Sequence, residues 1–517
     1  MKYIISVCLA LCLLAGCAVN PVTGRNELNI VSMAQQRQIG AEQYEPSQQS
    51  QGGEYTADPA LSAYVNQVGQ RIAAESDLAL DYEFVVLNNG VPNAWALPGG
   101  KIAVNRGLLL ELNNEAELAA VLGHEVVHAA AGHGAQAITR GTLLQGAMVL
   151  SAVAAARSNE YADYIVGASA LGAQLITQSY GREAERESDH YGIQYMVSAG
   201  YDPRAAVTLQ EVFVRLSEGG GNSSWLDGLF ASHPPSTERV MNNQALVDEL
   251  WPTLAGRDLE LGEARYQQAI AGLKESKPAY DLMAEAERAI REDDLETAWD
   301  KLDDAIRLFP DEPRFHGLQA DILVYQRRYR AAIDKYDATI AMDAGYFDYF
   351  LGRGVAHSRL NQTAAARTDL QRSAALLPTA MAANELGRIS LAAGQRNEAK
   401  QYFQSAASAG GALGQEALNA FLQLDVQDNP ANYVQAQTYA DANGRIIVRL
   451  GNRSPAVLRN IEVQVSAVIN GAVVQRNLRA GSLDAGVYQD YQSGLSFPAG
   501  STWNADMMGA VVSSATP

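Results

Sequence analysis

Residues 115–128 read EAELAAVLGHEVVH, and this stretch decides the fold of the first half of the chain. It opens on strong helix formers, so it is predicted to be an α-helix. Four residues turn a helix by about 400°, which puts His124 and His128 on one face, about 40° apart. Two imidazoles placed in this way can share one zinc ion, and Glu125 lies beside the first of them. The pattern predicts a zinc site in which Glu125 moves the proton, although the same spacing also occurs by chance in unrelated helices.

A catalytic zinc needs a third protein ligand, and the segment 181–192, GREAERESDHYG, offers one. This segment is also helical in character, and Glu185 and Asp189 lie one turn apart in it. Without the upstream histidines, these carboxylates would be interpreted as a solvated helix face. The histidine pair determines their interpretation as part of a metal site.

The two segments together resemble the gluzincin metallopeptidases of the HtpX and BepA type, whose second helix carries a Glu-x-Glu-Ala-Asp signature. The resemblance implies that Glu185 is the third zinc ligand and that Asp189 orients a ligating histidine. It also implies one zinc ion per chain. Ser188 stands where the family signature has alanine.

Three further segments add to this resemblance. Residues 20–24, NPVTG, look like the family's N-terminal signature. Residues 93–100, NAWALPGG, precede a strand at 101–104, which in such enzymes forms an active-site edge able to pair with an extended peptide. Residues 232–236, SHPPS, followed by Arg239, resemble a motif near the metal, which implies an outer role for Arg239.

His233 in that last motif has three possible roles. It could be a fourth zinc ligand that acts as a switch, because the preceding stretch, 217–224, is rich in glycine and serine. It could instead stabilise the tetrahedral oxyanion, or cap the helix that begins nearby. His133, nine residues after His124, does not fit the metzincin pattern and is expected to be structural or to lie outside the ligand set.

The N-terminus has the layout of a secretory signal peptide, with Lys2 before an apolar run over 4–14 that is too short to cross a bilayer. The run ends in LAGC, residues 14–17, which resembles the lipobox of bacterial lipoproteins. The resemblance implies that Cys17 is lipidated and that, with Ala18 after it, the protein is anchored in the outer membrane facing the periplasm. A plain signal peptide and a free periplasmic protein are the alternative.

A repeat follows the first half of the chain. Ala298, Ala332 and Ala366 lie 34 residues apart, and Ala399 follows 33 residues later. A leucine or aromatic residue stands four positions after each alanine, at Leu302, Tyr336, Leu370 and Phe403. This period resembles tetratricopeptide repeats, which implies paired helices stacked into a solenoid with a concave groove. A generic array of helical hairpins is the alternative.

The last segment is predicted to be a small all-β, sandwich-like domain. Residues 446–450 and 461–465 are rich in β-branched residues and are predicted strands. Asn470-Gly471 predicts a hairpin turn before the next strand.

Composition restricts the class of protein. The chain has 517 residues, more than one hydrophobic core usually organises, and is 47% hydrophobic and 19% charged, as in folded globular domains. A net charge of −19 opposes phosphate binding, so no nucleic-acid partner is expected. All 3 cysteines lie at or before position 17, which leaves the predicted domains without thiols.

These features predict a signal peptide (1–17), an α+β zincin-like metallopeptidase domain (18–256), a helical linker (257–278), an all-α repeat solenoid (279–425) and a small all-β domain (433–517). The expected function is a zinc-dependent endopeptidase of the bacterial envelope that hydrolyses misfolded or misassembled proteins. The repeats would recruit the client or the outer-membrane assembly machinery, and the lipid anchor would contact the membrane. The alternative is a repeat-based chaperone or scaffold in which the zinc site is structural or latent.

Overall fold

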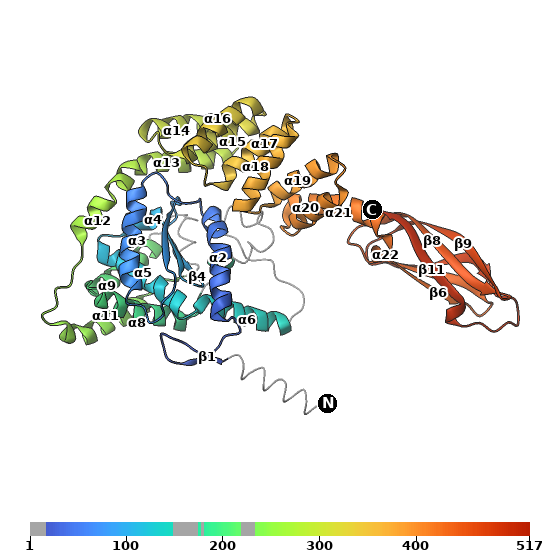
Figure 1. Cartoon of the computed structure of the whole chain (residues 1–517), viewed down its shortest axis with the longest axis horizontal. Helices are drawn as coiled ribbons and strands as arrows, with labels where there is room; N and C mark the ends of the chain where they lie inside the picture. Colours follow the sequence, from blue (N-terminus) through green and yellow to red (C-terminus); the bar gives the residue numbers. More distant parts are fainter. Residues whose placement is uncertain (1–16, 148–173, 177–179, 219–232) are drawn as a thin grey trace. The chain divides into compact units, whose positions relative to one another are not determined.

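The computed structural model describes residues 17–147, 174–176, 180–218 and 233–517 (Figure 1). The predicted signal at 1–16 and most of the glycine-rich stretch before His233 lie outside these residues. Contacts divide the chain into two compact units, residues 1–382 and 383–517, and each is described by itself. Within the described residues, no helix is both long enough and apolar enough to cross a membrane.

The histidine-bearing helix is α5, Glu115–Ala130, and it is buried along its whole length. The side chain of Asn114 caps its first turn by accepting a hydrogen bond from the backbone N–H of Glu117 at 2.9 Å. A helix that is buried on every side has to lie inside its domain. The helices that pack against it include α3 (Pro59–Ala73), α8 (Arg182–Ser198) and α9 (Arg204–Glu218).

Glycine sets how closely α5 approaches α8. A Cβ atom at Gly192 would lie 3.0 Å from the carbonyl carbon of Gly123 and from the backbone nitrogen of His124. Backbone atoms cannot swing aside as a flexible side chain can, so a larger residue here would push the two helices apart. The contact brings the helix that carries His124 against the helix that carries Glu185.

A three-stranded sheet lies beside α5, with strand order β3-β5-β4. Strands β3 (Glu83–Leu87) and β5 (Lys101–Asn105) are parallel, while β4 (Ala94–Leu97) is antiparallel to β5. The prediction that residues 101–104 form the active-site edge is therefore wrong, because β5 has a partner on both sides. Gly99 and Gly100, with φ of 84° and 91°, turn the chain back so that β4 takes the edge.

The remaining elements of this part of unit 1 surround the helices and the sheet. They are β1 (Cys17–Val19), β2 (Asn26–Leu28), α2 (Met33–Ser50), α4 (Arg106–Glu111), α6 (His133–Ala147), α11 (Thr237–Leu250), η1 (Trp251–Leu254) and α12 (Glu263–Ala269).

The repeats form helix pairs, which confirms the predicted all-α repeat region. In unit 1 they are α13 (Ala271–Arg291) with α14 (Leu295–Leu308), α15 (Pro313–Tyr325) with α16 (Tyr329–Met342), and α17 (Phe347–Arg359) with α18 (Thr363–Leu376). Next come α19 (Ala380–Ala392), α20 (Arg396–Ala407) and α21 (Gly411–Asp428). The four alanines that define the period are fully buried, because a small side chain is needed where paired helices touch.

Within unit 1, the first repeats pack onto the sheet region through a buried polar cluster. The guanidinium of Arg106 lies 3.4 Å from the ring centre of Tyr280, and its Nε donates to Asn88 Oδ1 at 2.8 Å. Asn88 in turn donates to Glu312 at 3.0 Å, and Glu312 caps α15. These contacts, all buried, attach the repeat helices to the end of β3.

Unit 2 ends in two antiparallel three-stranded sheets, which confirms the predicted all-β region. Their orders are β10-β7-β6 and β11-β8-β9, after a short helix α22 (Pro430–Tyr433). The strands are β6 (Val434–Ala440), β7 (Arg445–Asn452), β8 (Leu458–Ile469), β9 (Ala472–Leu483), β10 (Tyr488–Ser496) and β11 (Met508–Thr516), with η2 (Ala505–Met507) before the last. Residues of β7 and β8 share one core. The predicted hairpin is confirmed, since Asn470 and Gly471 have φ of 53° and 78° between β8 and β9.

Candidate active site

Four buried side chains converge between α5 and α8. His124 and His128 lie one turn apart on α5, with their Nε2 atoms 3.0 Å from each other. Glu185 of α8 places its oxygens 3.5 Å and 3.4 Å from these two nitrogens. His233, just before α11, places Nδ1 3.0 Å from Glu185 Oε1 and 3.3 Å from His124 Nε2. One nitrogen or oxygen from each of the four residues lies within 4.8 Å of the others.

A second group of residues holds this cluster from outside. Asp189 Oδ1 lies 3.0 Å from His124 Nδ1, the nitrogen that faces away from the cluster. Arg239 of α11 donates to both oxygens of Asp189, at 2.8 Å and 2.7 Å, and places Nη1 3.0 Å from Glu185 Oε2. A carboxylate on the outer nitrogen fixes the orientation of a ligating imidazole.

The electrostatics of the cluster favour a bound cation. Burial alone would raise the pKa of Glu185, but His233 and His124 outweigh it and hold that pKa well below its usual value. Burial would lower the pKa of His124, but Asp189 and Glu185 outweigh it and raise the pKa to about 9. The negative field that favours a proton on His124 also favours a metal ion. Burial lowers the pKa of His128 well below its usual value, which leaves a neutral imidazole ready to coordinate.

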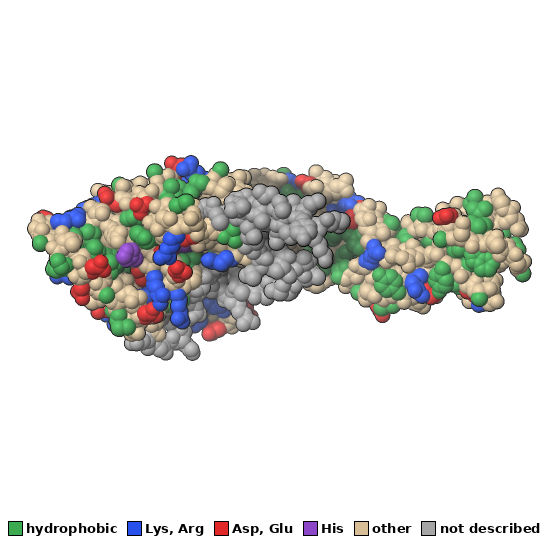
Figure 2. Space-filling model, turned by 90° about the horizontal axis from the view of Figure 1, so that it is seen from below, with side chains coloured by type: hydrophobic (Ala, Val, Ile, Leu, Met, Phe, Trp, Pro, Cys, Tyr) green, Lys and Arg blue, Asp and Glu red, His purple; other side chains and the backbone are tan. Residues whose placement is uncertain are grey.

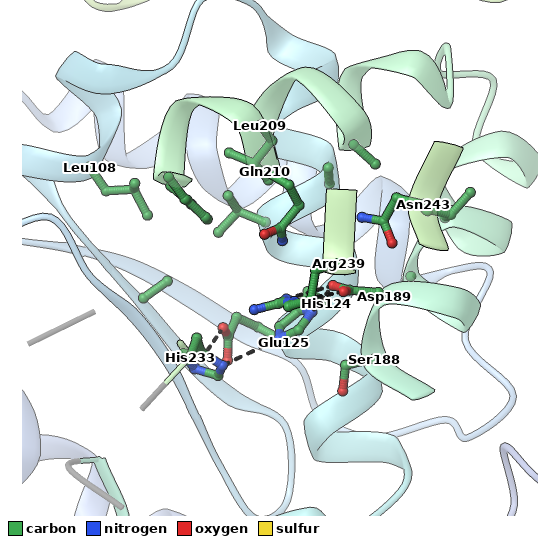
Figure 3. A pocket seen from close by; sticks show the side chains of 17 residues that line it. Leu108, His124, Glu125, Ser188, Asp189, Leu209, Gln210, His233, Arg239 and Asn243 are labelled. Carbon is green, nitrogen blue, oxygen red and sulfur yellow. Dashed lines mark hydrogen bonds and ion pairs between the residues drawn. The ribbon is translucent and has the colours of Figure 1, made fainter. Parts of the chain in front are cut away.

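Glu125 faces the same centre from α5. Its Oε1 lies 3.5 Å from His233 Nε2, while its buried Oε2 has no hydrogen-bond partner among the described residues. Burial raises the pKa of its carboxyl group, although His233 and His124 oppose the shift. A cavity of about 30 Å³ adjoins His124, Glu125 and His233 (Figure 3). That volume admits a water molecule but no substrate side chain.

The donor set fits a zinc ion. Imidazole nitrogens and a single carboxylate oxygen are the ligands that zinc takes in catalytic sites. Glu185 Oε2 is buried and accepts no hydrogen bond from the described residues, although it lies 3.0 Å from Arg239 Nη1 and 3.5 Å from His124 Nε2. A cation between the imidazoles would satisfy this oxygen. His124, His128 and Glu185 would hold the metal, and His233 is near enough to join them.

The structure thus brings together every residue that the sequence analysis connected with metal chemistry, Asp189 and Arg239 included. Other predicted features lie elsewhere. Cys17 begins β1, far in sequence from the residues of the cluster.

Two features of the site were missed from the sequence. The ring of Tyr180 stacks on that of His128, with centroids 4.1 Å apart, and the backbone contact at Gly192 sets the spacing of α5 and α8. Tyr180 directly precedes the GRE segment, so its nearness to the signature was the available signal. Gly192 lies within that segment, three residues after Asp189, but a glycine in a helix does not reveal which helix it meets.

The helix-borne histidine pair, the carboxylate from a second helix and the adjacent glutamate define a metallopeptidase centre. Residues 59–247 match the model of peptidase family M48. The matched residues include α5 and α8, the two helices that meet at the cluster.

Curated proteins similar to the chain are peptidases. A mitochondrial metalloendopeptidase OMA1 of Schizosaccharomyces pombe is 29% identical over 231 residues, covering 44% of this chain and 66% of that protein. The beta-barrel assembly-enhancing protease of Escherichia coli is 26% identical over 252 residues, covering 47% and 51%. The metalloprotease YcaL of Escherichia coli is 31% identical over 150 residues, covering 29% and 56%. The matched part of each relative is thus less than two thirds of its length.

Solved structures similar to the chain include repeat proteins. MamA from Desulfovibrio magneticus is 18% identical, with 29% of this chain and 84% of that chain covered and a TM-score of 0.26. TTC0263 of Thermus thermophilus, a tetratricopeptide-repeat protein, is 14% identical, with 30% and 84% covered and a TM-score of 0.26. The repeat assignment rests on the helix pairs and their period.

Proposed function

We propose that this chain is a zinc-dependent endopeptidase of the bacterial envelope. The observation that carries the proposal is Glu125 Oε2, which has no hydrogen-bond partner among the described residues. Glu125 lines a water-sized cavity beside the His124, His128 and Glu185 cluster. A buried carboxylate with a raised pKa, next to a place for water and for a metal, is suited to general-base hydrolysis.

His124, His128 and Glu185 would hold a zinc ion, which would supply Lewis acidity toward a peptide carbonyl and a water molecule. Glu125 Oε2 accepts the proton of the attacking water and passes it to the nitrogen of the leaving amine. Asp189 accepts a hydrogen bond from His124 Nδ1 and so keeps Nε2 turned toward the centre, while Arg239 holds Asp189 in place. Strand β4 is the sheet edge and has no strand partner on its outer side within the described residues, so an extended substrate could pair with it. Its residue Ala94 lines the cavity.

His233 is proposed as a fourth ligand that keeps the resting enzyme latent. Its Nδ1 lies among the ligand atoms, and the cavity beside it, about 30 Å³, is of the size of a water molecule. Its departure from the cluster would open a position for substrate and leave its ring near Glu125, where it can stabilise negative charge on the reacting carbonyl oxygen.

The envelope role is proposed from the sequence together with the relatives. LAGC at 14–17 resembles a lipobox, so we propose lipidation of Cys17 and an outer-membrane anchor facing the periplasm. One relative carries beta-barrel assembly in its name. We propose misassembled envelope proteins as substrates. The repeats would recruit the client or the assembly machinery. The proposed domain bounds are 18–256 for the peptidase domain, 279–425 for the repeats and 433–517 for the β domain.

Charge on the surface fits protein partners better than nucleic acid. On the face in Figure 2, Lys and Arg side chains are interspersed with Asp and Glu side chains, and the whole chain carries a net charge of −19. The net negative charge repels a phosphate backbone at long range.

The second candidate is a scaffold or chaperone with a structural zinc, and the presence of His233 in the cluster favours it. A structural zinc site has four protein ligands and no open position. The two functions differ in their dependence on Glu125, which is needed only for hydrolysis.

The experiment measures zinc per chain and cleavage of unfolded casein by the parent, Glu125→Gln and His233→Ala. The proposal expects one zinc per chain in the parent, loss of cleavage with zinc retained in Glu125→Gln, and faster cleavage in His233→Ala. Absence of zinc from the parent, or cleavage unchanged by Glu125→Gln, would refute the peptidase function. Zinc bound equally by all three without any cleavage would favour the scaffold.

A further inference from the structure

The outer nitrogen of His128 is held by another histidine. His128 turns Nε2 toward the cluster and places Nδ1 2.9 Å from Nδ1 of His133, the first residue of α6. His133 is 1% exposed, and its Nε2 lies 3.3 Å from Oε2 of Glu187 on α8. A chain of contacts therefore runs from His128 through His133 to a carboxylate.

The protons of this chain can be assigned in only one way once His128 is a ligand. A ligating His128 offers the lone pair of Nε2 to the metal, so its hydrogen is on Nδ1. That N–H donates to Nδ1 of His133, which must then be the unprotonated nitrogen. The hydrogen of His133 is consequently on Nε2, where it donates to Glu187. The hydroxyl of Ser188, 3.5 Å from His133 Nδ1, points to the same accepting nitrogen.

We infer that His133 is a positioning residue for the metal centre, fixing the tautomer and orientation of His128, with Glu187 as the terminal acceptor. The inference rests on the proposed function, because it takes His128 as a ligand. Asp189 serves His124 directly, whereas an imidazole stands between His128 and its carboxylate. The two ligating histidines are thereby oriented from α8 by different groups.

The N-terminal NPVTG segment supports the position of His133. Asn20 is buried, and its Nδ2 donates to the carbonyl oxygen of Ala131 at 3.3 Å, between the end of α5 and His133. Its Oδ1 accepts from the backbone N–H groups of Val22 and Thr23, which closes the turn. Arg25, directly after the segment, lies 3.1 Å from Glu187 Oε1, but this arginine is 63% exposed and contributes little stability. The segment thus acts on the metal centre through Asn20, by fixing the junction that carries His133.

The test compares the zinc dissociation constants of full-length variants by competition with a chelating dye. In His133→Asn, the side-chain oxygen takes the place of Nδ1 and can accept from His128. In His133→Leu, a side chain of similar volume offers no acceptor. Loss of an outer hydrogen-bond partner typically weakens metal binding by about 10- to 100-fold. We expect that loss in His133→Leu and zinc binding close to that of the parent in His133→Asn, an order that packing alone would not produce.

A matched pair on α8 tests the other end of the chain. Glu187→Leu removes the acceptor of His133, and Glu183→Leu removes the other carboxylate that contacts Arg25, one turn away. Zinc binding should weaken in the first and stay at the parent level in the second. This pair also decides the matter if His133→Leu does not fold, which circular dichroism would show.

The outcomes separate this inference from the proposed function. If the parent binds zinc and cleaves casein, but Leu and Asn at position 133 bind zinc equally, or Glu187→Leu equals Glu183→Leu, the positioning role is overturned. If the parent binds no zinc, the proposed function fails, and the assignment of His128 as a ligand fails with it.

Discussion

Replacing Arg239 with methionine should lower the free energy needed to separate α8 from α11. Arg239 joins α11 to α8 by donating to both oxygens of Asp189, and its side chain is 8% exposed. Methionine keeps much of the length but leaves Asp189 as a buried charge whose remaining partner among the described residues is His124. Breaking a buried pair from one side costs about 3 to 5 kcal/mol, which is about a hundredfold or more in the opening equilibrium.

The assay is hydrogen–deuterium exchange of peptides from α8 and α11 in the metal-free chain, where metal binding cannot mask the change. Arg186→Met is the matched control, since Arg186 pairs with Glu238 between the same two helices but both side chains are about half exposed, at 53% and 49%. Arg186→Met should lower the free energy of opening by at most about 1 kcal/mol.

A second variant tests the reason for the cost. Arg239→Met combined with Asp189→Asn removes both charges, so the double variant should be more stable than the sum of the two single changes predicts. Equal exchange in Arg239→Met and Arg186→Met would refute the reasoning, and so would strict additivity in the double variant.

Three other outcomes are expected. Gly192→Ala should destabilise the α5–α8 pair by about 1 to 3 kcal/mol and weaken zinc binding, because its Cβ would meet the backbone of Gly123. Gly181→Ala is the control, since a Cβ there meets nothing within 4 Å. Equal zinc dissociation constants in the two variants would contradict this prediction. Removing zinc with a chelator should abolish casein cleavage and lower the melting temperature of the peptidase domain. Hydrogen–deuterium exchange in α15–α18 should stay unchanged. Cleavage that survives chelation would exclude metal dependence. Gly471→Ala should lower the stability of the β domain by about 1 to 2 kcal/mol, because Gly471 has φ of 78°. The loss should appear as faster hydrogen–deuterium exchange in β8 and β9. Unchanged exchange would show that the turn relaxes.

The parts of the fold that follow from local sequence were predictable. The spacing of His124 and His128 fixes their shared face once the segment is helical, and the structure has their Nε2 atoms 3.0 Å apart. The period of 34 residues predicted the helix pairs, and Asn470-Gly471 predicted its hairpin. Each of these patterns is a relation between residues close in the chain or repeated along it.

The resemblance to a family supplied what local patterns could not. Glu185 lies 57 residues after His128 in the chain, and no helical or strand period connects them. Its place at 3.4 Å from His128 Nε2 depends on how α8 packs against α5. The signature on the second helix indicated this residue, and composition or spacing alone would have left it on a solvated face.

By itself, the sequence determined the helices that carry the site, the repeat array and the β hairpin, because helix periodicity and turn preferences act over a few residues. Only the tertiary structure decided that β4 rather than β5 forms the sheet edge, that α5 and α8 meet at two glycines, and that His133 stands between His128 and Glu187. These relations depend on which buried faces meet. That choice is made by packing among segments far apart in the chain, and the same local patterns are compatible with several such packings.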